Sequence, residues 1–588
     1  MSTPFPPHAL HDYALLADGE RGALIGPDGA VVWLCAPTWH DEALFAALVG
    51  GGGGYAVTPR QAHVPGGHYE DGTLIWRSRW ITTRGIVECR EALAFPGDPD
   101  RLVLLRQVRA VDGPARLDVV LDPHAAYGRA PLDEVRQGDD GVWQMRTGGL
   151  RLRWQGASSA VVGEGGLRAE LELRPGESHD LVLECAATSL PREPPRAAEL
   201  WAAAEAAWRR AVPPLERTIA PTDARRACAV LRGLTARGNG MVAAATTSLP
   251  ERAEEGRNYD YRYVWIRDQA YAGQAAAAAG VHDLLDAAVR FVTERLLVDG
   301  PRLAPAYTVH GGPVPDQREL DLTGYPGGFD RVGNQVRSQF QLDGFGEALL
   351  LFAAAARAHR LEDDAWKAAA VAVRAIEERH GQPDAGVWEL DARRWTHSRL
   401  ACVAGLRALA TAAPRHPLAE TCARLADTVL ASVSTTGVHP EGRWQRAPDD
   451  PGVDAALLLP AVRGALHADD PRTAATLAAC RRDLARDHFV YRFRHDERPL
   501  EQAEGAFLLC GFVMALAEHR QGHPVEAYRW FERNRAACGA SGLYAEEFDI
   551  AQRQLRGNLP QAFVHALLLE TAARLDHEPG THGGLRGR

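Results

Sequence analysis

Lysine is almost absent from this sequence of 588 residues: Lys367 is the only one, so arginine supplies nearly all of the positive charge. Several enzyme mechanisms need a lysine at a fixed place, including the P-loop that holds nucleotide phosphates and the Schiff base of pyridoxal-phosphate enzymes. Lys367 lies in the helical stretch EDDAWKAAAVAV, where a surface position is expected. The sequence therefore argues against both of these enzyme classes.

Other catalytic motifs are missing as well. There is no HExxH, no paired CxxC, no GxSxG and no Walker sequence, which disfavours zinc proteases, dithiol redox enzymes, serine hydrolases and nucleotide hydrolases. The nine cysteines are odd in number and scattered, mostly among apolar residues, so we expect buried, reduced thiols. We predict no metal site and no cofactor.

The sequence also lacks long apolar runs and an excess of positive charge. No apolar run reaches the length of a membrane span, and the start MSTPFPPHALHDYALL has neither the basic nor the apolar part of a secretion signal. With a net charge of −10 and a pI near 6.1, binding to nucleic acid or to an anionic membrane is not expected. We predict a cytoplasmic protein.

The chain does show a change of pattern from strands to helices. Short alternating runs separated by Pro-Asp-Gly and Pro-Gly-Glu turns fill residues 20 to 190, which indicates an antiparallel β-sandwich or supersandwich. We therefore expect a multidomain protein of β and all-α parts. Its predicted divisions are a β-sandwich domain at 1–190, a proline-bounded helical linker at 191–221, an all-α catalytic domain at 222–577 and a loose tail at 578–588.

The second part contains about twelve helical segments by apolar spacing. They are expected to begin near Thr222, Asp268, His282, Gln335, Glu362, Ser398, His416, Gly452, Pro471, Glu504, Pro524 and Leu559. No strict repeat is visible, so a closed ring of six helical hairpins, an (α/α)6 barrel, is favoured over a solenoid. The long loops at 299–334, 381–397, 434–451 and 539–558 would gather at one end and carry the chemistry.

One stretch, RNYDYRYVWIRD at 257–268, mixes aromatic and charged residues in an unusual way. Tyr259, Tyr261, Tyr263 and Trp265 alternate with polar residues, so their rings would share one face of an extended segment. At Asp268 the pattern becomes that of a helix. Taken alone, the stretch is equally consistent with a capped helix start beside an aromatic core.

Two other stretches place carboxylates in loops. Glu389 follows a glycine turn and an indole in GVWE, and burial against an aromatic ring generally favours the protonated form that a general acid needs. Glu546 is the first of two glutamates in GLYAEEFD, where an anchored carboxylate could activate water. Taken alone, each stretch is more typical of a solvated loop than of a catalytic site.

The motifs RNYDYRYVWIRD, GVWE, EGAFLLCGF, GLYAEEFD and GNLPQAFVHALLL occur in this order, and together they resemble glycoside hydrolase family 15. That family contains glucoamylases, glucodextranases and bacterial trehalase-like enzymes. The stretch DYALLADGERGALIGPDGAVVWLCAPTW is similar to the β domain of the bacterial branch. The resemblance implies inverting hydrolysis of an α-glucosidic bond at a nonreducing glucose, inside an (α/α)6 barrel.

The resemblance also implies roles for single residues. Glu389 matches the general acid and Glu546 the general base, and an inverting pair sits about 6.5–9.5 Å apart so that water fits between. The predicted substrate-binding residues, which grip the glucose hydroxyls or line the pocket, are Tyr261, Trp265, Arg267, Asp268 and Trp388. Arg399 departs from the family pattern, which leads us to expect lysine there.

The expected function is thus that of an inverting, exo-acting hydrolase that releases β-glucose from the nonreducing end of α-glucosyl oligosaccharides, as glucoamylases do. Three alternatives stay open: an α,α-trehalase of the same family, an inverting phosphorylase that uses phosphate in place of water, and a silent carbohydrate-binding protein on the same fold. The expected partner is a small oligosaccharide. The sequence makes no prediction about the oligomeric state.

Overall fold

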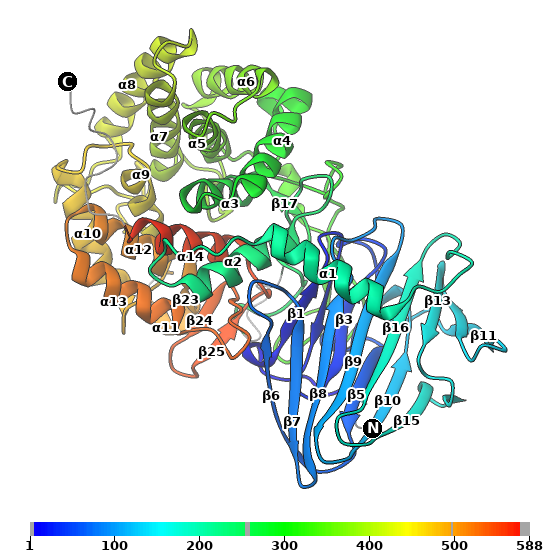
Figure 1. Cartoon of the computed structure of the whole chain (residues 1–588). Coiled ribbons are helices and arrows are strands. Elements are labelled where there is room, and N and C mark those ends of the chain that lie inside the picture. Colours follow the sequence, from blue (N-terminus) through cyan, green and yellow to red (C-terminus); the bar gives the residue numbers. More distant parts are fainter. Residues whose placement is uncertain (1–4, 253–258, 496–497, 577–588) are drawn as a thin grey trace.

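The chain forms a β-sheet domain followed by a helical domain (Figure 1). The computed structural model describes residues 5–252, 259–495 and 498–576. Arg257 and Asn258 of the aromatic stretch, and the tail predicted at 578–588, lie outside the described residues.

Two sheets of eight strands each make up the N-terminal domain as far as it is described, and every pairing within them is antiparallel. The first sheet contains β1 (Ala14–Ala17), β2 (Gly22–Ile25), β3 (Ala30–Cys35), β4 (Ala43–Phe45), β5 (Gly54–Pro59), β10 (Ala115–Asp122), β14 (Val161–Gly163) and β15 (Gly166–Leu173). The second contains β6 (His63–Tyr69), β7 (Trp76–Thr82), β8 (Gly85–Leu93), β9 (Leu102–Asp112), β11 (Leu132–Gln137), β12 (Trp143–Thr147), β13 (Leu150–Gln155) and β16 (Ser178–Ala186).

The two sheets share a buried core, as the alternating sequence pattern predicts. Along β15 the residues alternate between buried and exposed, which is typical of a strand with one face on a core. Between the sheets, the Trp154 indole donates a hydrogen bond to the Tyr55 hydroxyl at 3.0 Å, and Arg106 donates to the Tyr55 carbonyl at 2.8 Å. The predicted β-sandwich is confirmed.

Helix α1 (Ala197–Ala211) connects the two domains. It packs along the β domain, where Trp208 stacks on Phe95 with ring centroids 3.9 Å apart. The Arg90 guanidinium lies 4.4 Å from the Trp201 ring of the same helix. These contacts fix the connection against the sandwich by aromatic packing.

In the helical domain, six inner helices of the described chain form a closed ring, and six outer helices surround it. The inner ones are α3 (Ile266–Ala279), α5 (Asp343–Arg357), α7 (Thr396–Ala412), α9 (Leu459–Val462), α12 (Leu508–Arg520) and α14 (Ala562–Arg574). The outer ones are α2 (Pro221–Leu234), α4 (His282–Asp299), α6 (Asp363–Arg379), α8 (Leu418–Thr436), α10 (Pro471–Leu484) and α13 (Pro524–Arg535). The predicted (α/α)6 barrel is confirmed.

Burial explains which helices are inner and which are outer. α12 is apolar almost all round, as a helix covered on both sides must be, whereas α6 buries only one stripe containing Ala365, Ala368 and Ala372. α5 and α7 approach so closely that a Cβ at Gly346 would lie 2.5 Å from the backbone of Ala401. Glycine is required at this crossing.

Short strands and one short helix lie in the connections between the barrel helices. They are β17 (Val264–Trp265) with β18 (Ala306–Tyr307), β19 (Arg318–Glu319) with β20 (Arg331–Val332), β21 (Ala485–Arg486) with β22 (Phe489–Val490), the trio β23 (Ala506–Phe507), β24 (Glu547–Asp549) and β25 (Gln554–Arg556), and helix α11 (Leu500–Ala503). Gln335, where a long helix was expected, starts a 3-10 turn at Gln335–Ser338 instead, and α5 begins only at Asp343.

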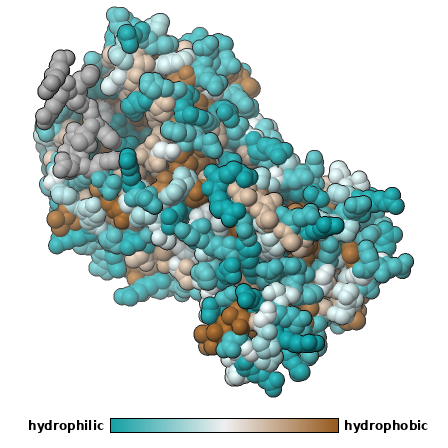
Figure 2. All heavy atoms as spheres, viewed as in Figure 1, coloured by the Kyte–Doolittle hydropathy of each residue, from teal (hydrophilic) through white to brown (hydrophobic). Residues whose placement is uncertain are grey.

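The surface is hydrophilic over most of the face in Figure 2, with a hydrophobic patch at the tip of the β domain. Val64 and Ile81 pair across β6 and β7 and are 65% and 57% exposed. None of the helices built from the described residues has both the length and the apolar character that crossing a bilayer requires.

Candidate active site

A cavity of about 400 Å³ lies at the end of the barrel where inner helices α3 and α14 begin. It brings together all of the residues that the sequence analysis selected, although they are up to 285 positions apart in the chain. These are Tyr261, Trp265, Arg267, Asp268, Trp388, Glu389 and Glu546. The cavity is therefore the candidate site.

The aromatic stretch runs into this cavity with its side chains divided between two sides. Tyr261 and Trp265 line the cavity with their rings edge to face at a centroid distance of 5.5 Å. Tyr263 is also buried, but its ring lies 5.9 Å from that of His40 in the β domain. Tyr259, Tyr261 and Trp265 line the cavity, as the alternation predicts, whereas Tyr263, which was predicted on the same face, is not among the lining residues.

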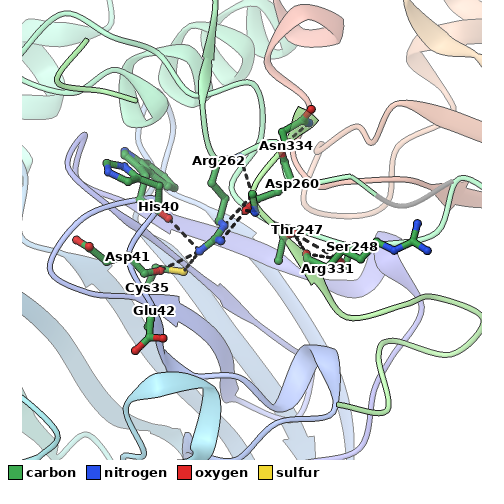
Figure 3. Close-up of polar contacts among 12 residues, drawn as sticks. Cys35, His40, Asp41, Glu42, Thr247, Ser248, Asp260, Arg262, Arg331 and Asn334 are labelled. Atoms are coloured by element: carbon green, nitrogen blue, oxygen red, sulfur yellow. Dashed lines mark hydrogen bonds and ion pairs between the residues drawn. The ribbon is translucent and has the colours of Figure 1, made fainter. Parts of the chain in front are cut away.

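The charged residues of the stretch anchor it to the N-terminal domain (Figure 3). Arg262 is 1% exposed and donates hydrogen bonds to Asp260 at 2.7 and 2.9 Å. Its guanidinium also reaches the Cys35 sulfur at 3.2 Å and the Asp41 carbonyl at 2.9 Å, both in the β domain. Asp260 in turn accepts from the backbone of Gly333 at 2.9 Å, next to cavity residue Asn334.

Glu389 lies at a tight turn and is held by the aromatic stretch. Its φ of +57° is in the left-handed region, which costs a non-glycine residue energy and often marks a functional position. The Trp265 indole donates a hydrogen bond of 2.6 Å to its Oε1, and the Arg267 guanidinium lies 3.7 Å from the same atom. Trp388, its neighbour in the chain, instead donates to Asp454 at 2.9 Å. The indole that contacts Glu389 is therefore not the adjacent one.

Arg267 and Asp268 occupy the first turn of α3, and the side chain of Asp268 does not cap the helix. They form an ion pair of 3.1 Å, and Arg267 also donates to the Val387 carbonyl at 2.9 Å. Burial raises the pKa of Asp268 to about 6. Its two carboxylate oxygens are buried and, apart from the ion pair, have no hydrogen-bond donor among the described residues, so they are available to ligand hydroxyls.

Glu546 enters the cavity from the loop before β24, where the Tyr261 hydroxyl donates a hydrogen bond of 3.2 Å to its Oε1. Burial raises its pKa well above the ordinary value, and the charge of Glu251 raises it further. Arg492 and the Tyr261 hydrogen bond act in the opposite direction. The two aromatic residues of the stretch, themselves in contact, thus each hold one of the two glutamates.

Several lining residues were missed by the sequence analysis. Arg492, Phe493 and His495 reach the cavity from a segment between α10 and α11 that was not among the predicted loops, and Glu251 comes from the start of the helical domain. A basic and aromatic run, FVYRFRH at 489–495, is the signal that could have identified the first three. Arg399, the departure from the family pattern, is buried and pairs with Asp384 outside the cavity lining.

No group of three or more potential metal ligands occurs within the described residues. The cavity is lined by three glutamates, Glu251, Glu389 and Glu546, together with the buried Arg267–Asp268 pair and aromatic rings. Such a set suits acid-base chemistry on a polar ligand that also has apolar faces, as sugars do.

The family model of "Glycosyl hydrolases family 15" matches residues 232–573, more than half of the chain. The chain belongs to this family. A second family model, "Trehalase-like, N-terminal", matches residues 6–208, which is the β-sandwich domain with α1. This family 15 protein is accordingly a glycoside hydrolase.

Individual relatives agree with the family. A trehalase of Mycolicibacterium smegmatis is 29% identical over 98% of this chain and 92% of its own length. Trehalase 1 of Sulfolobus acidocaldarius is 29% identical over 59% of this chain and 62% of its own length. A crystal structure of a bacterial glucoamylase complexed with acarbose superimposes with a TM-score of 0.70 and 14% identity, over 98% of this chain and 96% of that one. That structural likeness supports the fold.

Proposed function

We propose that this glycoside hydrolase acts on α,α-trehalose and releases two molecules of glucose. The observation that carries the proposal is that trehalases match the chain along its whole length, the N-terminal domain included. The comparisons thus favour the trehalase alternative over the α-glucan oligosaccharides that the sequence analysis ranked first. The glucoamylase-like activity stays an unconfirmed alternative.

In the proposed mechanism, Glu389 is the general acid. It donates its proton to the glycosidic oxygen as the bond from that oxygen to C1 breaks, so the leaving glucose departs neutral. The indole N–H of Trp265 and the guanidinium of Arg267 contact Oε1 of Glu389. These contacts orient the carboxyl group and stabilise the carboxylate left after the proton has been transferred.

Glu546 is the proposed general base. It takes a proton from the water that attacks C1 from the opposite face of the sugar ring, and the hydroxide oxygen becomes the new anomeric hydroxyl. The Tyr261 hydroxyl fixes the orientation of Glu546 by donating to its Oε1. Tyr261 and Trp265, which hydrogen-bond to the proposed base and acid, are only four residues apart in the chain. This short segment would therefore fix the distance between Glu389 and Glu546.

Asp268 and Arg267 are the proposed glucose-binding pair. The buried oxygens of Asp268 would accept hydrogen bonds from hydroxyls of the reacting glucose, and the guanidinium of Arg267 would donate to sugar oxygens. Tyr261, Trp265 and Trp388 would pack on the apolar faces of the ring.

The test combines site variants with a stereochemical assay. Glu389→Gln and Glu546→Gln should each lower kcat on trehalose by about 10³-fold or more, since each removes a proton-transfer group. Exposed Glu441→Gln is the matched control and should retain full activity. NMR at early times should show equal amounts of α- and β-glucose from trehalose, because inversion affects only one of the two products. Full activity of either glutamine variant, or α-glucose alone, would refute the mechanism.

Substrate identity needs a separate measurement. We expect kcat/KM for trehalose to exceed that for maltose, isomaltose and a longer α-glucan measured side by side. A higher value for maltose or for the glucan would support the glucoamylase-like alternative. Formation of a glucose phosphate only when phosphate is added would support a phosphorylase.

A further inference from the structure

A second cavity, of about 690 Å³, lies at the end of the barrel opposite the active site. Helices α3, α5, α12 and α14 start near the catalytic cavity, and the last turns of all four border this second one. α14, with 13 residues, separates the two cavities by about 20 Å. The second cavity is thus distinct from the proposed trehalose site.

The lining of this cavity is rich in arginine, and none of the described residues that line it is acidic. The arginines are Arg357, Arg407, Arg463, Arg520 and Arg574, and the rest of the wall is mostly alanine, leucine and valine. Two carboxylates pair with this set: Glu570 with Arg463 and Arg574, and Asp427 with Arg407. Positive charge therefore exceeds negative charge around the cavity.

Arg357 and Arg520 are the two arginines of this cavity whose positive charge could interact with a ligand. Neither has a hydrogen-bond or ion-pair partner within residues 5–252, 259–495 and 498–576. Both side chains remain exposed to solvent at the cavity. Partial desolvation still lowers the pKa of both, and the nearby charge of Arg574 lowers it further. The charge of Arg574 thus acts on both guanidinium groups beside one cavity, although Arg574 itself pairs with Glu570. An anion bound there would relieve this repulsion.

Arginine in the last turn of a helix has an ordinary explanation, since it interacts favourably with the carbonyl end of the helix dipole. That effect accounts for one cation at each helix end. It does not explain why three such ends, those of α5, α12 and α14, surround a hollow whose described lining contains no acidic side chain. A bound anion explains both the hollow and the charge.

We propose that this cavity binds the phosphoryl group of a small molecule. Guanidinium forks match phosphate oxygens in pairs, which favours phosphate over a single-charge anion such as chloride. The volume lies in the range of small-molecule sites and exceeds what a phosphate ion alone would fill, and the apolar part of the wall suits an organic group attached to it. The site is independent of the proposed trehalase activity.

Binding can be measured on the full chain without any substrate. Inorganic phosphate and glucose 6-phosphate would be titrated separately, with glucose and with sodium chloride of equal ionic strength as controls, while Tm and heats of binding are recorded. We expect a saturable rise in Tm with the phosphate probes alone, because a ligand that binds the native state stabilises it. Tighter binding of glucose 6-phosphate would assign an organic phosphate, and equal affinity would assign inorganic phosphate.

The matched variants locate the binding. Arg357→Gln/Arg520→Gln should weaken binding at least about tenfold, the loss expected for charge-assisted hydrogen bonds, and should leave Tm without anion near that of the wild type. Arg374→Gln, an exposed arginine of outer helix α6, should bind as the wild type does. Arg357→Lys/Arg520→Lys keeps the charge if the glutamine variant does not fold, and should bind with intermediate affinity. A Tm rise no larger than with sodium chloride, or unchanged affinity in both double variants, would overturn the proposal.

Discussion

At the scale of single residues, the environment of Glu546 sets how activity should depend on pH. Glu546, the proposed general base, must be ionised to act, and burial together with Glu251 raises its pKa above the ordinary range. As the pH is lowered, activity should therefore begin to fall at a pH above the ordinary pKa of a glutamate. Glu251→Gln removes a negative charge and so lowers the pKa of Glu546. The acidic limb of the kcat/KM profile should then move to lower pH, and a limb that stays in place or moves upward would contradict this.

The indole of Trp265 gives a second prediction at this scale. Its N–H donates a hydrogen bond of 2.6 Å to Glu389, and a hydrogen bond to a charged group contributes about 1.5–3 kcal/mol. Trp265→Phe keeps the aromatic surface and should lower kcat by roughly ten- to hundredfold. Trp388→Phe is the comparison, because the indole of Trp388 donates to Asp454 instead. Equal losses of kcat in the two variants would show that the bond to Glu389 has no special role.

At the scale of elements, the turn between β25 and α14 supports the position of Glu546. Gly557 has a φ of +83°, and a Cβ there would lie 3.2 Å from the Cβ of Glu546. Gly557→Ala should cost about 1–2 kcal/mol of stability from the left-handed backbone and should also lower kcat by displacing Glu546. Gly442→Ala is the control, since Gly442 has a φ of +81° and nothing within 4 Å of its missing Cβ. Thermal unfolding and kinetics of both variants separate strain from crowding.

Elements and site residues differed in how well the sequence predicted them. Helix starts with clear apolar spacing were placed within two residues, as at His282, Pro471 and Pro524, because local periodicity decides them. The start expected at Gln335 gave only a 3-10 turn: Asn334 caps it, as a helix start requires, but the turn ends at Ser338. Local signals specify a start and do not specify how far a helix continues.

For the site, the sequence likewise identified residues that lie in short motifs but not the contacts between residues far apart in the chain. Glu389, Glu546 and the aromatic stretch lie in contiguous motifs and could be selected from the sequence. Their hydrogen-bond partners could not be predicted from the sequence. Glu389 adopts a φ of +57° and contacts Trp265, which is 124 residues away, rather than Trp388 beside it. Arg492 and Glu251 reach the cavity only through the closure of the barrel.

At the scale of the whole molecule, the β domain and the barrel are joined by hydrogen bonds across the interface between them. The Trp33 indole of β3 donates to the Ala245 carbonyl at 2.8 Å, and the Tyr325 hydroxyl donates to the His8 carbonyl at 2.7 Å. The contacts of Arg262 with Cys35 and Asp41 connect this interface to the segment that holds both glutamates. The N-terminal domain therefore contacts the backbone of the candidate site, although the described residues that line its cavity lie in the helical part.

Removing the Arg262 side chain tests this dependence. Arg262→Met leaves the carboxylate of Asp260 buried without its ion-pair partner, which typically costs about 3–5 kcal/mol. Asp260→Asn/Arg262→Met removes the unpaired charge and should recover part of that loss, so the two substitutions are not additive. Arg60→Met breaks exposed surface pairs with Asp118 and Glu170 and should change the free energy of unfolding by less than about 1 kcal/mol. If the interface positions the aromatic stretch, the double variant should be more stable than Arg262→Met and should still show a reduced kcat on trehalose. A double variant with wild-type kcat would show that the site is positioned by the barrel alone.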